Sequence, residues 1–271
     1  MGKMHNHETV HHVDLLIYIV VGVMIFGYLA MVYMTNRTHK KWSSARIVFW
    51  ILGVMAVTLG IIGPITQQAM QGSFVAHMMN HLLLGMLGPL LIVLAAPMTL
   101  LLRSVPVVWG RFISGLLKST YVRWITHPII ASVINAGGLW ILYTTGLYNA
   151  MHTSLLLYVL IHLHVFLAGY VFTLSMIYIE VTPHRYSFKF RAIVLILAMA
   201  AHGILSKWIY ANPPIGVDIL DAQQGGMLMY YGGDAVDVIL VIILCYQYFS
   251  SKNQVEKRKA FNASKHLKGI G

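Results

Sequence analysis

Seven long apolar runs dominate this chain and limit what it can fold into. A helix needs about 20 mostly apolar residues to cross the hydrocarbon core of a bilayer, and each run reaches about that length. Because backbone polar groups within lipid must be hydrogen-bonded inside the segment, such runs form membrane-spanning helices. The runs are predicted at Leu15–Met34, Ile47–Ile65, His77–Leu102, Pro128–Leu147, Leu155–Ile179, Ala192–Tyr210 and Gly226–Phe249.

The composition supports a membrane protein rather than a soluble domain. Of the 271 residues, 58% are hydrophobic and 10% are charged, whereas soluble domains are about 45–50% apolar and about 25% charged. No repeat at a fixed period and no linker divides the chain. We therefore predict an all-α polytopic membrane protein, a bundle of seven transmembrane helices over residues 14–249. An outer His-rich tail (1–13) precedes it and a basic cytoplasmic tail (250–271) follows it.

The positive charges fall on one side of this seven-helix topology. Seventeen of the 19 Lys and Arg residues lie after the first, third and fifth runs or in the C-terminal tail, and only Lys3 and Lys207 lie opposite. Short loops rich in Lys and Arg stay in the cytoplasm, so the N-terminus is predicted outside and the C-terminus inside. Cations clustered between apolar runs are not typical of nucleic-acid binding. Aromatic and basic residues mix over Val108–Trp124, which predicts a helix at the inner headgroup layer.

Histidines are numerous and lie towards the outer side. Ten of the fourteen fall outside the membrane or in its outer half under this topology. His77 and His81 are four apart, so they project from one helical face, and two imidazoles on one face can bind one metal ion. His162 and His164 are two apart and point to roughly opposite sides, so one of them is expected to face the same cavity as His81. A polar hydrogen bond between helices is the alternative role for each.

Two carboxylates lie within the last run, three residues apart on one face. Asp234 and Asp237 would each cost about 2.5–3.5 kcal/mol at membrane depth, so they are expected to face the interior and a partner. They are candidate functional residues, although they could serve only to satisfy a histidine or a hydroxyl. Asp221 precedes them at the outer end of the helix, where an Asp favours capping.

These residues together predict a metal site in the outer half of the bundle. We expect His81, one of His162 and His164, His202 and Asp234 to converge there, with His77 at the mouth and Asp237 orienting a ligand histidine. The single cysteine, Cys245, rules out a paired-thiolate site. Imidazole and thioether donors favour copper, with zinc as the second choice. The methionines considered for this role cluster near the outer ends: Met70, Met78, Met79, Met151, Met227 and Met229. The N-terminal tail is predicted to be a flexible metal collector through His5, His7, His11 and His12.

Several motifs follow one another in order between about Gly60 and Tyr248. They are His77-Met78-Met79-Asn80-His81, Gly88-Pro89, Ala96-Pro97, Thr126-His127-Pro128, His162-Leu163-His164 through Tyr170, His202, and Asp221-Ala222-Gln223-Gln224-Gly225-Gly226. In these motifs the chain resembles the bacterial CtaG-type cytochrome c oxidase assembly factors, a seven-helix membrane family. The stretch Ile179-Glu180-Val181-Thr182-Pro183 departs from the family's usual Trp-Pro and Asp-Pro.

The resemblance implies a role for the chain and a place in the cell. It implies a multi-pass protein of the bacterial cell membrane, not an enzyme, that helps mature a haem–copper oxidase. Its partners would be the lipid bilayer and the oxidase subunit that carries the buried copper centre, with copper supplied from the outer side. No nucleic-acid partner is expected.

Three other function classes stay open on the residues alone. A membrane haem protein could ligate haem through His202 and either His162 or His164. An intramembrane metallohydrolase could use His77, His81, His202 and Asp234, although the sequence shows no recognisable nucleophile for such an enzyme. A transporter would suit the helix breaks at Gly88-Pro89 and Ala96-Pro97.

Overall fold

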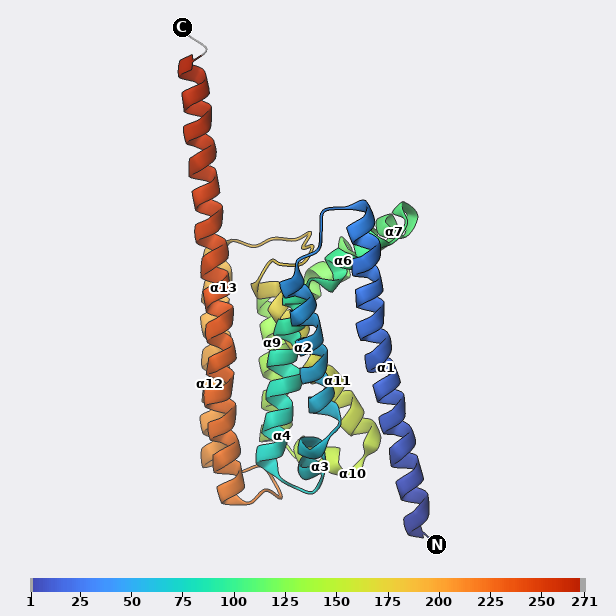
Figure 1. Ribbon diagram of the computed structural model, residues 1–271. Helices are drawn as coiled ribbons and strands as arrows, with labels where there is room; N and C mark the ends of the chain where they lie inside the picture. Colours follow the sequence, from blue (N-terminus) through green and yellow to red (C-terminus); the bar gives the residue numbers. More distant parts are fainter. Residues whose placement is uncertain (1, 269–271) are drawn as a thin grey trace.

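A computed structural model describes the backbone of residues 2–268 and the side chains of residues 15–253. This part of the chain consists of helices joined by turns and connections, and it contains no strand (Figure 1), which confirms the predicted all-α class. The elements are α1 (Gly2–Thr38), α2 (Ser44–Ile61), α3 (Pro64–Met70), α4 (Phe74–His81), the π-helix η1 (Leu82–Leu87), α5 (Gly88–Ala95), α6 (Pro97–Ser104), α7 (Val107–Leu117), α8 (Thr120–Ile125), α9 (Pro128–Thr144), α10 (Leu147–Thr153), α11 (Leu155–Met176), α12 (Phe188–Ala211) and α13 (Ile219–Lys268).

Six continuous helical segments of the described chain are long and apolar enough to span a membrane, and a bent seventh raises the number to seven. The bent one joins α9 and α10 through an angle of 78°. The chain is therefore a multi-pass membrane protein, as predicted. The six continuous spans are Leu15–Thr38, Ser44–Met70, Phe74–Ser104, Leu155–Met176, Phe188–Ala211 and Ile219–Asn253.

The connections divide between the two ends of the bundle. α3 and α10 lie at the same end as the N-terminus, whereas α6 and α7 lie towards the C-terminal end (Figure 1). The connection between α11 and α12 lies at the C-terminal end as well. The cation-rich segments therefore share one end, which the predicted topology requires. Which end faces the cytoplasm stays a prediction, and the N-terminal end is called the outer end below on that basis.

The third span is continuous although it changes helix type. Pro89 has no N–H to donate to the carbonyl of Gly85 one turn earlier, and the chain forms a π-helix at Leu82–Leu87. π-Turns of this kind are frequent at functional sites, and this one begins directly after His81. α11 approaches here so closely that a Cβ added at Gly169 would clash with the backbone oxygen of Gly85.

A buried carboxylate holds the other break of this span. Ala96 is the one non-glycine residue of the described chain with positive φ, at 55°, and α6 starts directly after it. Glu180, from the connection after α11, accepts hydrogen bonds from the backbone N–H of Met98 (2.8 Å) and Thr99 (2.9 Å) and from the hydroxyl of Thr99 (2.7 Å). It therefore caps α6 in the stretch that departs from the family pattern. Burial raises the pKa of the Glu180 carboxyl, while these hydrogen bonds and Arg46 act in the opposite sense.

The segment predicted at the membrane surface forms two short helices, α7 and α8. The side chains of Trp109, Phe112, Tyr121 and Trp124 are all more than half exposed. Their position at the headgroup layer stays a prediction.

The predicted domain boundaries fall inside helices. α1 begins at Gly2, so the backbone of the outer tail continues into the first span, and α13 runs on to Lys268. The metal collector predicted for this tail lies outside the described side chains and stays a prediction. Its histidines are His5, His7, His11 and His12.

Candidate metal site

The helix that carries His77 and His81 is fixed at its start by a carboxylate from the far end of the chain. Asp221 of α13 accepts hydrogen bonds from the backbone N–H of Phe74 (2.6 Å) and Val75 (3.2 Å). The first N–H groups of a helix have no partner within it, and negative charge is favoured there. Asp221 therefore caps α4 rather than its own helix, and it ties the two histidines to α13.

His81 and His202 form a buried pair between α4 and α12. Their ring centroids are 6.2 Å apart and the rings are tilted by 30°. Only 6% of His81 and 9% of His202 is exposed. Both ring nitrogens of His81, and Nε2 of His202, are buried without a hydrogen-bond partner. Leaving a buried polar group unsatisfied costs about 1–3 kcal/mol, so three such nitrogens together indicate a ligand.

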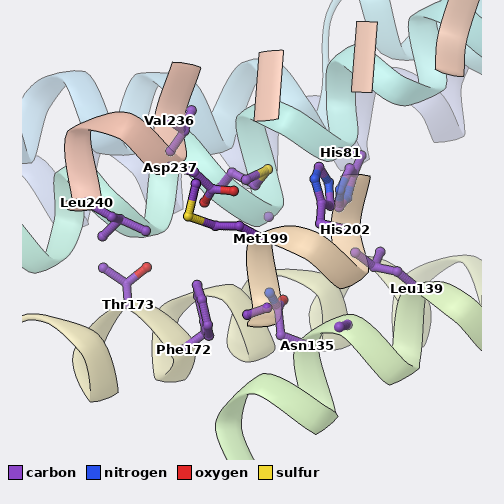
Figure 2. A pocket seen from close by; sticks show the side chains of 14 residues that line it. His81, Asn135, Leu139, Phe172, Thr173, Met199, His202, Val236, Asp237 and Leu240 are labelled. Atoms are coloured by element: carbon purple, nitrogen blue, oxygen red, sulfur yellow. The ribbon is translucent and has the colours of Figure 1, made fainter. Parts of the chain in front are cut away.

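A small cavity of about 30 Å³ adjoins this pair. Figure 2 shows His81 and His202 grouped at one end of it and Asp237 away from them, beside Met199. Asp237 is 3% exposed. The lining is completed by Gly85, Met86, Asn135, Ala136, Leu139, Phe172, Thr173, Ala198, Val236 and Leu240.

The two carboxylates of α13 differ in their position. Asp237 lines the cavity, whereas Asp234 is only partly buried and does not line it. Asp234 still lies close enough to His202 and Asp237 to interact with both electrostatically. The structure thus places Asp237 at the cavity, where we expected Asp234, and leaves Asp234 beside the histidine.

Small residues make room for the two rings. A Cβ added at Gly233 of α13 would clash with the ring of His202. One added at Gly85 would lie 2.8 Å from Cγ1 of Val165 and 3.2 Å from Nδ1 of His81. Gly233 therefore lets α13 approach the ring of His202, and Gly85 lets Val165 of α11 pack beside the ring of His81.

His77 belongs to a second group, nearer the outer end. Its Nε2 is 3.0 Å from the hydroxyl of Tyr143, and its ring centroid is 6.0 Å from that of His162 and 6.5 Å from that of His152. We expected His77 at an open mouth, but it is buried because Tyr143 and Tyr148 pack against it, with Tyr148 at 5.0 Å between centroids. His152 is the exposed member of the group.

Of the two histidines on α11, His162 is the one that faces the interior. His164 is exposed, and a Cβ added at Gly138 of α9 would clash with its ring. It therefore lies against α9, away from both groups.

The predicted residues thus gather in two groups and not in one ligand shell. In the described part of the chain, no three His, Cys, Asp or Glu side chains lie close enough together to hold a metal ion. Three of the predicted methionines (Met78, Met151 and Met229) belong to an apolar core cluster and do not line the cavity. The methionines that line it, Met86 and Met199, carried no signal in the sequence.

Sequence reasoning also missed His152 as a member of the histidine groups. Tyr148 and His152 are four apart and so share one helical face, and this spacing could have indicated that they act together. The signal was hidden because His152 falls between two of the predicted apolar runs, Pro128–Leu147 and Leu155–Ile179.

Comparisons with known proteins identify a family and several relatives of the chain. The family model described as "Cytochrome c oxidase caa3 assembly factor (Caa3_CtaG)" matches residues 26–251. An uncharacterized protein of Mycobacterium leprae is 24% identical over 272 residues, covering 93% of this chain and 41% of the relative. Uncharacterized proteins of Mycobacterium bovis and Mycobacterium tuberculosis are each 26% identical over the same length and with the same coverage.

These comparisons define the family and its reach. The chain spans about two fifths of the length of these relatives. No solved structure matches it. Because the family model covers most of the chain, from the first span to the last, the protein is a member of the cytochrome c oxidase caa3 assembly factor family.

Proposed function

We propose that this protein binds a copper ion between His81 and His202 and supplies it to a haem–copper oxidase during assembly. The family is that of an oxidase assembly factor. The observation that carries the proposal is the buried imidazole pair, in which three of the four ring nitrogens have no hydrogen-bond partner.

The spacing and the donors suit Cu(I). Metal–nitrogen bonds to histidine are about 2.0–2.1 Å long, so two imidazoles on opposite sides of one ion have centroids roughly 6 Å apart. The observed separation is 6.2 Å. Met86 and Met199 line the same cavity, and soft thioether donors select Cu(I). Asp237 lines the same cavity, away from the two histidines. Zinc takes four ligands, or three protein ligands and a water, which the described residues do not supply as arranged.

The size of the cavity favours a single ion over an organic cofactor. Sites for small organic ligands measure about 300–1,000 Å³, whereas this cavity measures about 30 Å³. A haem between His81 and His202 would require the helices to separate. A metallohydrolase would require a third protein ligand and an open metal position. Neither alternative is favoured by an observation of its own.

A weakly held ion also suits a protein that passes copper on. Two imidazoles with few further donors bind an ion less firmly than a closed four-ligand cage. The proposed recipient is the oxidase subunit that carries the buried copper centre. This protein would meet that subunit within the lipid bilayer.

The test is Cu(I) binding by the detergent-purified protein, titrated against a coloured Cu(I) chelator under reducing conditions. His81→Ala and His202→Ala should each abolish binding at the buried pair. His164→Ala is the matched control because His164 lies on the protein surface, and it should bind copper as the unaltered protein does. Unchanged copper binding in both His81→Ala and His202→Ala would refute the proposal.

A further inference from the structure

A second histidine group lies on the outer side of the buried pair, and the copper site proposed above does not use it. It comprises His152 on α10, His77 on α4 and His162 on α11, and it is called the outer group here. Its ring centroids are 6.5 Å apart between His152 and His77, and 6.0 Å apart between His77 and His162. These separations resemble the 6.2 Å of the buried pair, so each neighbouring pair can share one ion bound to two imidazoles.

The outer group connects the surface with the interior. His152 is exposed, His162 is partly buried and His77 is 4% exposed. His77 and His81 are one helical turn apart on one face of α4. His162 lies close enough to His81 to interact with it electrostatically. The four histidines therefore form a continuous path from α10 towards His202.

Backbone hydrogen bonds prepare two of these rings to bind metal. Nδ1 of His152 is 3.0 Å from the carbonyl oxygen of Tyr148, and Nδ1 of His162 is 2.8 Å from that of Tyr158. A carbonyl only accepts, so each Nδ1 carries the proton and donates it. A hydrogen bond at one ring nitrogen determines which nitrogen is available to a metal. In both rings the lone pair is consequently on Nε2.

Aromatic side chains enclose the middle of the path. His77 lies beside Tyr143 and Tyr148, and Phe74 packs edge-on against both tyrosines at 6.0 and 5.3 Å between centroids. Tyr143 also bonds Nε2 of His77, which orients the ring and leaves Nδ1 as the nitrogen that could bind an ion. A hydrated ion would have to lose its water here, which a weakly hydrated monovalent soft cation does most readily.

We propose that His152, His77 and His162 form a receiving site for Cu(I), which takes the ion at the α10 end and passes it to His81 and His202. This inference rests on the proposed function of the buried pair. Each transfer is an exchange of ligands: one imidazole–copper bond forms as another breaks. The imidazoles stay neutral and copper stays Cu(I), so the transfer consumes no oxidant and releases no proton.

Cu(I) titration of the full chain in detergent tests the receiving site, and every protein compared has the tail histidines replaced by Ala so that only the buried pair and the outer group are counted. These tail histidines are His5, His7, His11 and His12. The unaltered protein should bind two ions per chain, one in each group. His81→Ala should retain one ion, and a His77→Ala/His81→Ala double variant should retain none, because His77 belongs to both neighbouring pairs of the outer group. Tyr143→Phe should weaken the outer ion by about 10–100-fold, the range for loss of a group that orients a metal ligand. His164→Ala again serves as the control, and His152 is exposed, so its replacement leaves the core intact.

The rate of loading gives a second, independent readout. After rapid mixing with a Cu(I)–chelator complex, copper should reach the buried pair of the His152→Ala variant at least about tenfold more slowly than in the unaltered protein. The final copper occupancy of the buried pair should be unchanged, because His152 is not one of its ligands.

The outcomes separate the two proposals. If the unaltered protein binds one ion, and His81→Ala binds none, the receiving site is refuted and the buried site stands. If His81→Ala and the double variant each retain one ion, the outer group does not bind that ion. If copper reaches the buried pair of His152→Ala as fast as in the unaltered protein, the outer group is not the path by which copper enters. If the unaltered protein binds no Cu(I), both proposals fall.

Discussion

Asp221 should be the single carboxylate on which the position of α4 depends most. Replacement by alanine removes both hydrogen bonds, to Phe74 (2.6 Å) and Val75 (3.2 Å), and leaves two backbone donors without a partner. Hydrogen bonds to a charged group contribute about 1.5–3 kcal/mol each, and the second one here is longer. Asp221→Ala should therefore lower the free energy of unfolding by about 2–4 kcal/mol.

Asp218 supplies the matched control for this experiment. It lies three residues away, is exposed and caps its own helix, accepting from the N–H of Leu220 at 2.9 Å. Asp218→Ala should cost about 1 kcal/mol, as an ordinary cap does. Unfolding in mixed detergent gives both values, and hydrogen exchange over residues 73–81 locates the effect. If Asp221→Ala costs no more than Asp218→Ala, and exchange in α4 is unchanged, Asp221 does not hold the histidine helix.

Three further changes test the packing and electrostatics of the site. Gly169→Ala should destabilise the protein by about 1–3 kcal/mol or more, because its Cβ would clash with the backbone oxygen of Gly85. Thermal unfolding measures this loss. Gly27→Ala is the control and should be nearly neutral, because a Cβ there meets nothing within 4 Å. Gly233→Ala should displace His202 and weaken Cu(I) binding at the buried pair, while the outer ion, measured in the same titration, is retained. Burial raises the pKa of the Glu180 carboxyl above its ordinary value of 4.5, so the folded state binds more protons than the unfolded state. The free energy of unfolding should therefore fall as pH rises from that value through the raised pKa. Glu180→Gln should abolish this pH dependence of unfolding, and an unchanged pH dependence would show that Glu180 is not its source.

The membrane fold could be predicted from the sequence because it depends on run length alone. Each predicted run coincides with a span or with the bent pair α9 and α10. The bend was not predicted, although the connection contains Gly146, because a single glycine is a weak sign of a helix end. The bend brings α10 towards the start of α4, where His152 lies beside His77.

The site was harder to predict because it depends on how each helix is rotated. Spacing shows that His162 and His164 point apart, but the packing of His164 against Gly138 decides which one faces inward. In the same way Asp234 and Asp237 share one face, and a small rotation of α13 determines which of them reaches the cavity. Periodicity gives the direction of one side chain relative to another on the same helix. It does not give the direction of either relative to a neighbouring helix.

The third span is held at three levels, and this limits where movement during copper release can occur. Asp221 caps its outer end, Gly169 brings α11 against its π-helix, and Glu180 caps the segment after Ala96. Because His77 and His81 lie between these fixed points, we expect them to stay in place while their partners move. His152 lies on a short helix after a bend, and His202 is placed against a glycine of α13. In the proposed outer group, His77 thus lies on a fixed helix and His152 on a short helix after a bend, an arrangement that would let an ion be bound and then released without unfolding the core.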